Sequence, residues 1–377
     1  MNEIENASSN IRRAELDWLR AGLVLLVFLH HIAMPFNGSE WHIVNEDSSE
    51  LLDHIMVYFE QWRLPLLLLV SGAGTVLAFS KRTTGQFILE RSRRLLIPLL
   101  FGAFVIIPPQ TYLQFIDRYN SYFDVYPEAI TQAETNHLWF IEYLFTFSIL
   151  AVPLILFLRS ESSQRIKQSI EKFFTNPWRL LLWVLPLIAL RLLTQVLLSF
   201  EGDEISDWSK WLYYLYFFLA GIVLFSCKGL WNSLASNRNK YLLMVSISFV
   251  LFYGYYFVPQ DWLPLSLSIS LRWSIWWVVN CLAGWTTMLA IMAYAQTYLS
   301  KPKPWLAKIT EAVYPFYIFH QTVIVVLAYF IVKWNTTIAV KLLTLLVLSF
   351  LCIGVLYVCV RSFQLSRFLF GMKPKQK

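Results

Sequence analysis

Ten apolar stretches, each about as long as a lipid bilayer is thick, are the feature of this sequence that most constrains its fold. A transmembrane helix needs roughly 20 mostly apolar residues, and such runs recur along the whole chain of 377 residues. The runs cover residues 16–36, 52–79, 95–115, 138–158, 178–200, 208–226, 241–258, 270–298, 312–332 and 338–360. We therefore predict an all-α, polytopic integral membrane protein with about ten transmembrane helices.

The composition excludes most other classes of protein. Charged residues make up 15% of the chain and apolar residues 57%, with a mean hydropathy of +0.52, whereas soluble domains carry about 25% charge. Phe, Trp and Tyr, numbering 29, 16 and 19, suit a protein with many membrane–water interfaces. The four cysteines show no framework spacing, so neither a disulfide scaffold nor a zinc site is expected.

Basic residues gather on alternate connections between the runs. One side carries 23 Lys and Arg residues, and the other side carries only Arg118 and Lys333. Because cytoplasmic loops hold the excess of Lys and Arg, both termini are predicted to be cytoplasmic and the number of helices to be even. The formal charge of +7 is thus a topology signal, and the expected partner is the lipid bilayer and not nucleic acid. We divide the chain into a cytoplasmic tail (1–15), a transmembrane domain (16–360) and a basic cytoplasmic tail (361–377).

Ionisable side chains inside the runs are the first candidates for function, because burying them in a membrane is costly. The ones that we single out are Arg20, His30, His31, Glu60, Arg63, Glu142, Arg191 and His320. For some of these side chains, the alternative to a functional role is a purely structural one. Glu60 and Arg63, three residues apart, can neutralise each other on one helix face, and Arg191 has no obvious partner in the sequence.

The first run carries the most informative pair. Arg20 and His31 are eleven residues apart, which places both on one helix face at about 16 Å along the axis, while His30 points about 100° away. A cation suits an anionic cofactor, and an imidazole suits general base catalysis or nucleophilic capture of an acyl group. The alternative is that His31 is only a hydrogen-bonding residue.

Two further groups of residues extend this pattern. Five cations between Lys81 and Arg94 either set the topology, bind lipid headgroups or bind phosphates. His137 and Glu142 lie at the start of the fourth run, on the same side of the membrane as His31, and His320 lies within the ninth run. The three histidines and the Glu142 carboxylate can converge in a bundle core, but no two of the histidines have the helical spacing of a metal site, so no metal is expected.

Several motifs, in order, resemble the membrane acyltransferase family 3. They are Leu16-Asp17-Trp18-Leu19-Arg20 followed after ten residues by His31, Arg63-Leu64-Pro65-Leu66 through Ser71-Gly72, Arg91-Ser92-Arg93-Arg94 through Pro98, His137-Leu138-Trp139-Phe140, and Tyr317 through His320-Gln321. Trp41-His42-Ile43 and the Arg63 motif are similar to the glucan biosynthesis protein C type of that family. The resemblance spans residues 16 to about 330.

The resemblance implies transfer of an acyl group, acetyl or succinyl, from cytoplasmic acyl-coenzyme A to a hydroxyl of an extracytoplasmic glucan or other envelope carbohydrate. It implies a place in the bacterial cytoplasmic (inner) membrane and no permanently bound cofactor, because acyl-coenzyme A is a cosubstrate. The catalytic candidates are then His31, Glu142 and His137. Arg20, Arg91 and Arg94 are the candidates for binding coenzyme A, and Arg63, Trp139 and His320 are candidates for substrate binding or structural support.

A second class of function also fits the buried residues. A proton-coupled transporter of a sugar or small molecule uses histidine and glutamate relays inside the membrane. The absence of visible internal repeats and the arginine-rich connection favour the acyltransferase. A degenerate family member with a scaffold role is a third alternative, disfavoured by the presence of both Arg20 and His31.

Overall fold

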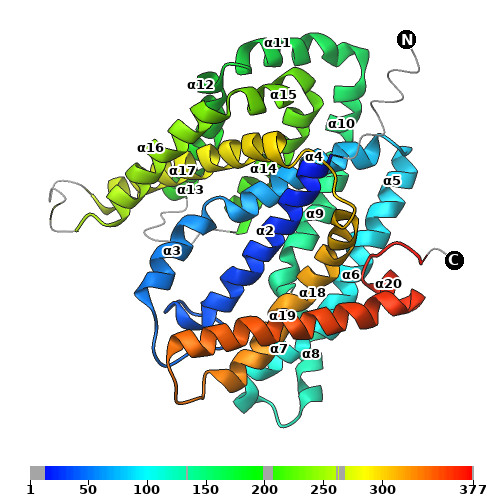
Figure 1. Ribbon diagram of the computed structural model, residues 1–377, viewed down its shortest axis with the longest axis vertical. Helices are drawn as coiled ribbons and strands as arrows, with labels where there is room; N and C mark the ends of the chain where they lie inside the picture. The colour runs from blue at the N-terminus through cyan, green and yellow to red at the C-terminus, as the bar shows by residue number, and fades with distance from the viewer. Residues whose placement is uncertain (1–12, 133–134, 198–206, 260–261, 263–267, 376–377) are drawn as a thin grey trace. The chain divides into compact units, whose positions relative to one another are not determined.

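The computed structural model describes residues 13–132, 135–197, 207–259, 262 and 268–375. Within these residues the chain forms helices joined by short connections, and no β-strand occurs (Figure 1). The prediction of an all-α, polytopic membrane protein is confirmed.

Eight helical segments within the described residues are long and apolar enough to cross a membrane. They are Ala14–Phe36, Glu50–Phe79, Thr84–Gln114, Pro177–Gln195, Trp208–Ser226, Ile269–Tyr298, Leu306–Ile331 and Ile338–Ser362. A ninth span is formed if Tyr122–Leu150 and Val152–Arg159, which meet at 45°, count as one broken span. The remaining predicted run, 241–258, forms helix α16 (Arg238–Tyr256), which begins with three polar residues. A count of ten spans stays a prediction.

The described helices group into two compact units. Unit 1 consists of residues 1–19, 61–80 and 151–306, and unit 2 of residues 20–60, 81–150 and 307–377. Helix α2 (Ala14–Ala33) starts in unit 1 and continues in unit 2.

Unit 1 is built around a close pair of helices, α4 (Arg63–Phe79) and α14 (Asp207–Ser226) (Figure 1). A Cβ added to Gly72 would lie 2.0 Å from the carbonyl oxygen of Phe218, and one added to Gly221 would lie 2.0 Å from that of Leu69. The two glycines thus let the helix backbones touch, as small residues do in membrane helix packing. The other helices of this unit are α10 (Val152–Arg159), α11 (Gln164–Phe174), α12 (Pro177–Leu180), η8 (Leu181–Val184), α13 (Leu185–Leu197), α15 (Lys228–Ser236), α16 and α17 (Ile269–Tyr298).

Unit 2 contains every element that bears the predicted histidines. Its elements are the greater part of α2, η1 (Met34–Phe36), α3 (Glu50–Glu60), α5 (Thr84–Arg91), η2 (Ser92–Leu96), α6 (Ile97–Phe101), η3 (Gly102–Ile106), α7 (Pro108–Gln114), η4 (Ile116–Arg118), η5 (Tyr122–Val125), α8 (Tyr126–Gln132), η6 (Asn136–Leu138), α9 (Trp139–Leu150), α18 (Leu306–Ile331), α19 (Ile338–Ser362) and α20 (Gln364–Leu369). Phe28 of α2 packs against Phe316 of α18 and Phe350 of α19, with ring centroids 5.2 and 6.4 Å apart.

The third span is irregular, and prolines explain why. It contains two π-helical turns, η2 and η3, which end just before Pro98 and Pro108. A proline inside a helix lacks an amide donor and clashes with the carbonyl four residues earlier, so the turn before it widens. The helix begins at Thr84, about ten residues before the predicted start, and Thr83 is its capping residue. Arg91 and Arg94 consequently lie on the helix itself.

The second predicted run is interrupted. Helix α3 ends at Glu60, residues Gln61 and Trp62 form a turn, and α4 starts at Arg63. The premise that Glu60 and Arg63 lie three residues apart on one regular helix is therefore wrong. The carboxylate of Glu60 lies 3.7 Å from Nε2 of His30.

Candidate active site

Three histidines that are far apart in the sequence meet in unit 2. His31 is near the end of α2, His137 in η6 and His320 in the middle of α18. The ring centroid of His320 lies 4.9 Å from that of His31 and 5.2 Å from that of His137. These residues form what we call the histidine cluster, and the convergence that the sequence suggested is observed.

Hydrogen bonds place the proton of His31 on one nitrogen. Nδ1 of His320 lies against the carbonyl oxygen of Tyr317 and donates to it, so Nε2 of His320 is an acceptor. Nδ1 of His31 lies 2.9 Å from the carbonyl oxygen of Val27 and 3.1 Å from Nε2 of His320. Both contacts are satisfied when His31 carries its proton on Nδ1. The basic lone pair of the neutral imidazole is then on Nε2, as a general base requires.

His137 and His320 are buried, whereas His31 is partly exposed. The exposed fractions of His137 and His320 are 5% and 1%. Nε2 of His137 donates to the carbonyl oxygen of Ile318 at 3.0 Å, and Nδ1 accepts from the amide of Gln110 at 3.4 Å. Since both ring nitrogens of His137 are engaged, His31 is the member of the cluster best placed to exchange a proton with a substrate.

A network of amide side chains surrounds His42 beside the histidine cluster. Nε2 of Gln321 donates to Oδ1 of Asn136 at 2.7 Å, to Oε1 of Gln110 at 3.0 Å, and lies 2.9 Å from Nε2 of His42. Nδ1 of His42 in turn lies 2.5 Å from Oε1 of Gln114. We call these residues the amide network. Through Gln110, which also donates to His137, it joins the histidine cluster.

The sequence analysis missed most of this network. Gln110, Gln114 and Asn136 were not considered, and His42 and Gln321 appeared only as parts of family motifs. Uncharged amides carry little signal in a sequence, because they are common in surface loops. The signal that was available is the position of Gln110 within an apolar run, directly after two prolines.

Two backbone features hold the network in place. Asn136 has a φ of +39°, a conformation that non-glycine residues rarely adopt. A Cβ added to Gly102 would lie 2.2 Å from a side-chain atom of Leu138, so the missing side chain lets the turn of His137 pack against η3.

A buried lysine anchors the loop that carries Trp41 and His42. The ammonium group of Lys341, with an exposed fraction of 6%, donates to Oδ1 of Asn45 at 2.7 Å and to the carbonyl oxygen of Val332 at 2.8 Å. The Trp41 ring lies 6.2 Å from that of His31. Lys341 lies in the last predicted run, yet the sequence analysis did not single it out.

Arginines gather elsewhere in unit 2 around one carboxylate. Nε of Arg94 lies 3.0 Å from Oε1 of Glu90, and Arg82 and Arg91 lie at 3.6 and 3.8 Å from the same side chain. The positive charges of Arg20, Arg82 and Arg94 all act on Arg91. These four arginines form the arginine cluster. Three guanidinium groups share this one carboxylate, and Arg20 adds a fourth positive charge beside Arg91. The cluster therefore keeps an excess of positive charge that suits a ligand with several negative charges.

The predicted site residues outside these clusters have other surroundings. Glu142 accepts a hydrogen bond from Thr135 at 3.0 Å, and within the described part of the chain no hydrogen bond or ion pair joins it to a histidine. Trp139 packs edge-on against Tyr143 at 5.0 Å. Arg63, with an exposed fraction of 4%, belongs to unit 1.

Arg191, the cation without an obvious partner in the sequence, lies between aromatic rings in unit 1. Its guanidinium carbon is 4.1 Å from the ring centroid of Tyr213 and 4.7 Å from that of Trp277. Cation–π attraction of this kind stabilises a charge that has lost its water.

No group of three or more metal-binding side chains is arranged to hold an ion within the residues that the structure describes.

A comparison with protein families gives one match. The family model described as an acyltransferase domain matches residues 13–361. The chain belongs to this acyltransferase family. The match covers both units and every residue of the histidine cluster, the amide network and the arginine cluster, so the protein is a multi-pass membrane acyltransferase. No curated protein and no solved structure matches the chain.

Proposed function

We propose that the protein transfers an acetyl or succinyl group from cytoplasmic acyl-coenzyme A to a hydroxyl of an extracytoplasmic glucan or another envelope carbohydrate. The family match supports the acyltransferase chemistry. The distribution of Lys and Arg supports a bacterial cytoplasmic membrane with both termini inside.

One observation carries the proposal. In unit 2, an excess of positive charge and a proton-accepting imidazole lie at different positions along the same helices. Arg20 and His31 lie on the same helix, eleven residues apart, which is about 16 Å along its axis. The charges of Arg91 and Arg94 act on Tyr314, which is six residues before His320 on α18. Two elements therefore run from the arginine cluster to the histidine cluster.

This separation suits coenzyme A. Its phosphates are too costly to transfer into hydrocarbon and would stay with Arg20, Arg91 and Arg94. Its slim thioester arm can enter the helix bundle and present the acyl carbonyl near His31. The donor would thus remain cytoplasmic while its acyl group crosses the membrane.

The proposed chemistry uses the lone pair on Nε2 of His31. This nitrogen takes the proton of the acceptor hydroxyl, and the oxygen attacks the thioester carbonyl carbon. The carbon–sulfur bond then breaks, and the departing thiolate receives the proton from His31. His320 positions His31 through the contact at Nδ1. A covalent alternative, in which Nε2 of His31 carries the acyl group before the hydroxyl takes it, uses the same residues.

The carbohydrate acceptor is supported by the surroundings of the histidine cluster. Trp41, His42 and the amide side chains offer an aromatic face together with several donors and acceptors, the groups that bind sugar hydroxyls. The resemblance of Trp41-His42-Ile43 and of the Arg63 motif to the glucan biosynthesis protein C type points to a glucan. Arg63 and Trp139 remain candidates for substrate binding.

The test is a transfer assay with the purified protein in nanodiscs of zwitterionic lipid. Radiolabelled acetyl- or succinyl-coenzyme A is supplied with glucan, and label on the glycan is measured beside released coenzyme A. We expect labelled glycan with the wild type and none with His31→Ala. Coenzyme A should also raise the melting temperature of the wild type. A protein that neither binds coenzyme A nor labels any envelope carbohydrate, but moves a sugar with protons, would refute the proposal in favour of a transporter.

A further inference from the structure

The C-terminal segment, residues 363–375, is a folded part of unit 2. The sequence analysis treated 361–377 as a basic tail, and the family match ends at residue 361. Within it the structure shows helix α20 followed by a backbone that turns back on it, with the amide of Met372 donating to the carbonyl oxygen of Arg367 at 2.8 Å. What this segment does is therefore a question about this chain and not about its family.

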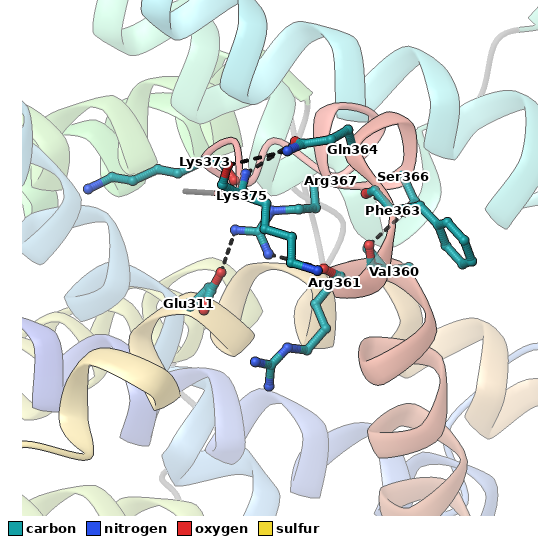
Figure 2. A network of polar contacts seen from close by, with 9 residues as sticks. All are labelled: Glu311, Val360, Arg361, Phe363, Gln364, Ser366, Arg367, Lys373 and Lys375. Atoms are coloured by element: carbon teal, nitrogen blue, oxygen red, sulfur yellow. Dashed lines mark hydrogen bonds and ion pairs between the residues drawn. The ribbon is translucent and has the colours of Figure 1, made fainter. Parts of the chain in front are cut away.

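Arg367 anchors the segment to α18. Its exposed fraction is 7%, and it donates to the carboxylate of Glu311 at 2.6 Å, to the carbonyl oxygen of Lys373 at 2.7 Å and to that of Arg361 at 3.3 Å. Figure 2 shows the side chain of Arg367 at the centre of these contacts. A buried guanidinium that satisfies several acceptors holds both ends of the segment together.

Two further contacts secure the segment. Gln364 exchanges hydrogen bonds with the backbone of Lys375, at 3.1 and 3.3 Å (Figure 2). Phe370, with an exposed fraction of 4%, packs against Phe319 and Phe101 with ring centroids 4.7 and 5.4 Å apart. The segment is thus held by apolar burial as well as by polar contacts.

The segment touches the arginine cluster at Gly371. This glycine has a φ of +62°, and a Cβ added to it would lie 2.6 Å from the carbonyl oxygen of Arg94 and 2.9 Å from the ring of Tyr314. Only a glycine fits this close approach. Lys373 follows two residues later, so its backbone lies within about 7 Å of Gly371, and its side chain is exposed.

Tyr314 offers a polar group at the same place. Its hydroxyl is buried, and within the described residues it has no hydrogen-bond partner. The charges of Arg94 and Arg91 act on it. A buried hydroxyl without a partner is costly unless a ligand supplies one.

We infer that the C-terminal segment is the outer wall of the donor site, where Lys373 and Lys375 bind the phosphates of acyl-coenzyme A and the hydroxyl of Tyr314 hydrogen-bonds to the bound donor. The inference rests on the proposed function, because it takes the arginine cluster to be the donor site. It adds residues that lie beyond the family match, and it gives the basic end of the chain a binding role.

The test measures coenzyme A binding by calorimetry in nanodiscs of zwitterionic lipid, which hold no anionic headgroups. We expect Lys373→Gln/Lys375→Gln to weaken binding about 3- to 10-fold at low salt and less at high salt, because exposed charges are screened. Tyr314→Phe keeps the ring against Gly371 and should weaken binding about 3- to 10-fold at both salt concentrations.

The matched control is Arg118→Gln/Lys333→Gln. It removes the same charge from unit 2, but Lys333 follows the far end of α18 from Glu311, more than 30 Å away along the helix. This variant should bind coenzyme A like the wild type. Hydrogen exchange gives an independent measurement, in which coenzyme A should slow exchange of the amides in residues 363–375.

The outcomes separate this inference from the proposed function. If the wild type does not bind coenzyme A, the proposed function fails first. If the wild type binds but the lysine variant and Tyr314→Phe bind equally well, and exchange in residues 363–375 is unchanged, the segment is not part of the donor site. If the lysine variant binds coenzyme A like the wild type but retains less phosphatidylglycerol when it is purified from membranes, the lysines contact lipid and the inference is wrong.

Discussion

His30 and His31 are neighbours in the sequence, but their side chains contact different residues. His30 faces Glu60 at 3.7 Å, whereas His31 contacts His320 at 3.1 Å. A change of one residue along a helix rotates a side chain by about 100°. The structure thus separates the two rings as their helical phase predicted.

We predict that His31→Ala lowers the rate of acyl transfer about 10²- to 10⁴-fold, the usual effect of removing a general base. His30→Ala should keep most of the activity. The measurement is acylated glycan formed per mole of purified protein, at equal expression and with coenzyme A binding retained in both variants. An active His31→Ala beside an inactive His30→Ala would reverse the assignment.

A second prediction concerns the arginine cluster. Arg91→Ala and Arg94→Ala should each weaken coenzyme A binding about 10- to 100-fold, since hydrogen bonds to charged groups contribute about 1.5–3 kcal/mol. The loss should be larger at low salt. Lysine at either position should restore binding only in part, because an ammonium lacks the two-pronged geometry of a guanidinium. If calorimetry shows that the alanine variants bind coenzyme A as tightly as the wild type, the cluster only sets the topology or binds lipid headgroups.

At the scale of elements, the contact between α4 and α14 depends on two glycines. An added Cβ at Gly221 would lie 2.0 Å from the carbonyl oxygen of Leu69, so the helices must separate to admit a methyl group. We expect Gly221→Ala to destabilise the protein by about 1–3 kcal/mol, the usual cost of overpacking. Gly254→Ala on α16 is the matched control, because its Cβ would meet nothing within 4 Å. Thermal unfolding in detergent measures both, and equal melting temperatures would contradict the close packing.

The loop that carries Trp41 and His42 depends on one buried lysine. Lys341→Met removes the hydrogen bonds to Asn45 and to the carbonyl oxygen of Val332 while keeping a long apolar side chain. Leaving buried acceptors unpaired costs about 1–3 kcal/mol for each group, and the loop should become mobile. We expect faster hydrogen exchange over residues 37–49 and weaker acceptor binding, with coenzyme A binding unchanged. Lys333→Met, at an exposed position, should show neither effect.

At the scale of the whole molecule, the prediction concerns topology. The distribution of 23 basic residues against two predicts that both termini are cytoplasmic. Reporter fusions at Asp47 and Asp203 should read as external, and fusions at Lys167 and Lys377 as internal. Asp203 and Lys377 lie outside the described residues, so the fusions test the charge pattern independently of the structure. An external reading at Lys377 would contradict an even number of spans.

The sequence by itself determined the helical class, the approximate extent of the runs and the family motifs. The reason is the bilayer, which demands long apolar helices and an asymmetric distribution of Lys and Arg. The spacing of Arg20 and His31 also follows from the sequence alone, because both lie on one regular helix.

Only the tertiary structure decided which polar groups meet. The turn at Gln61 and Trp62 divides the second run, and the π-helical turns before Pro98 and Pro108 alter the helical phase of every residue after them. Simple periodicity therefore failed to bring Gln110 to His137. The C-terminal segment escaped prediction for a similar reason: Arg367 is buried by a partner, Glu311, that lies 56 residues away along the chain.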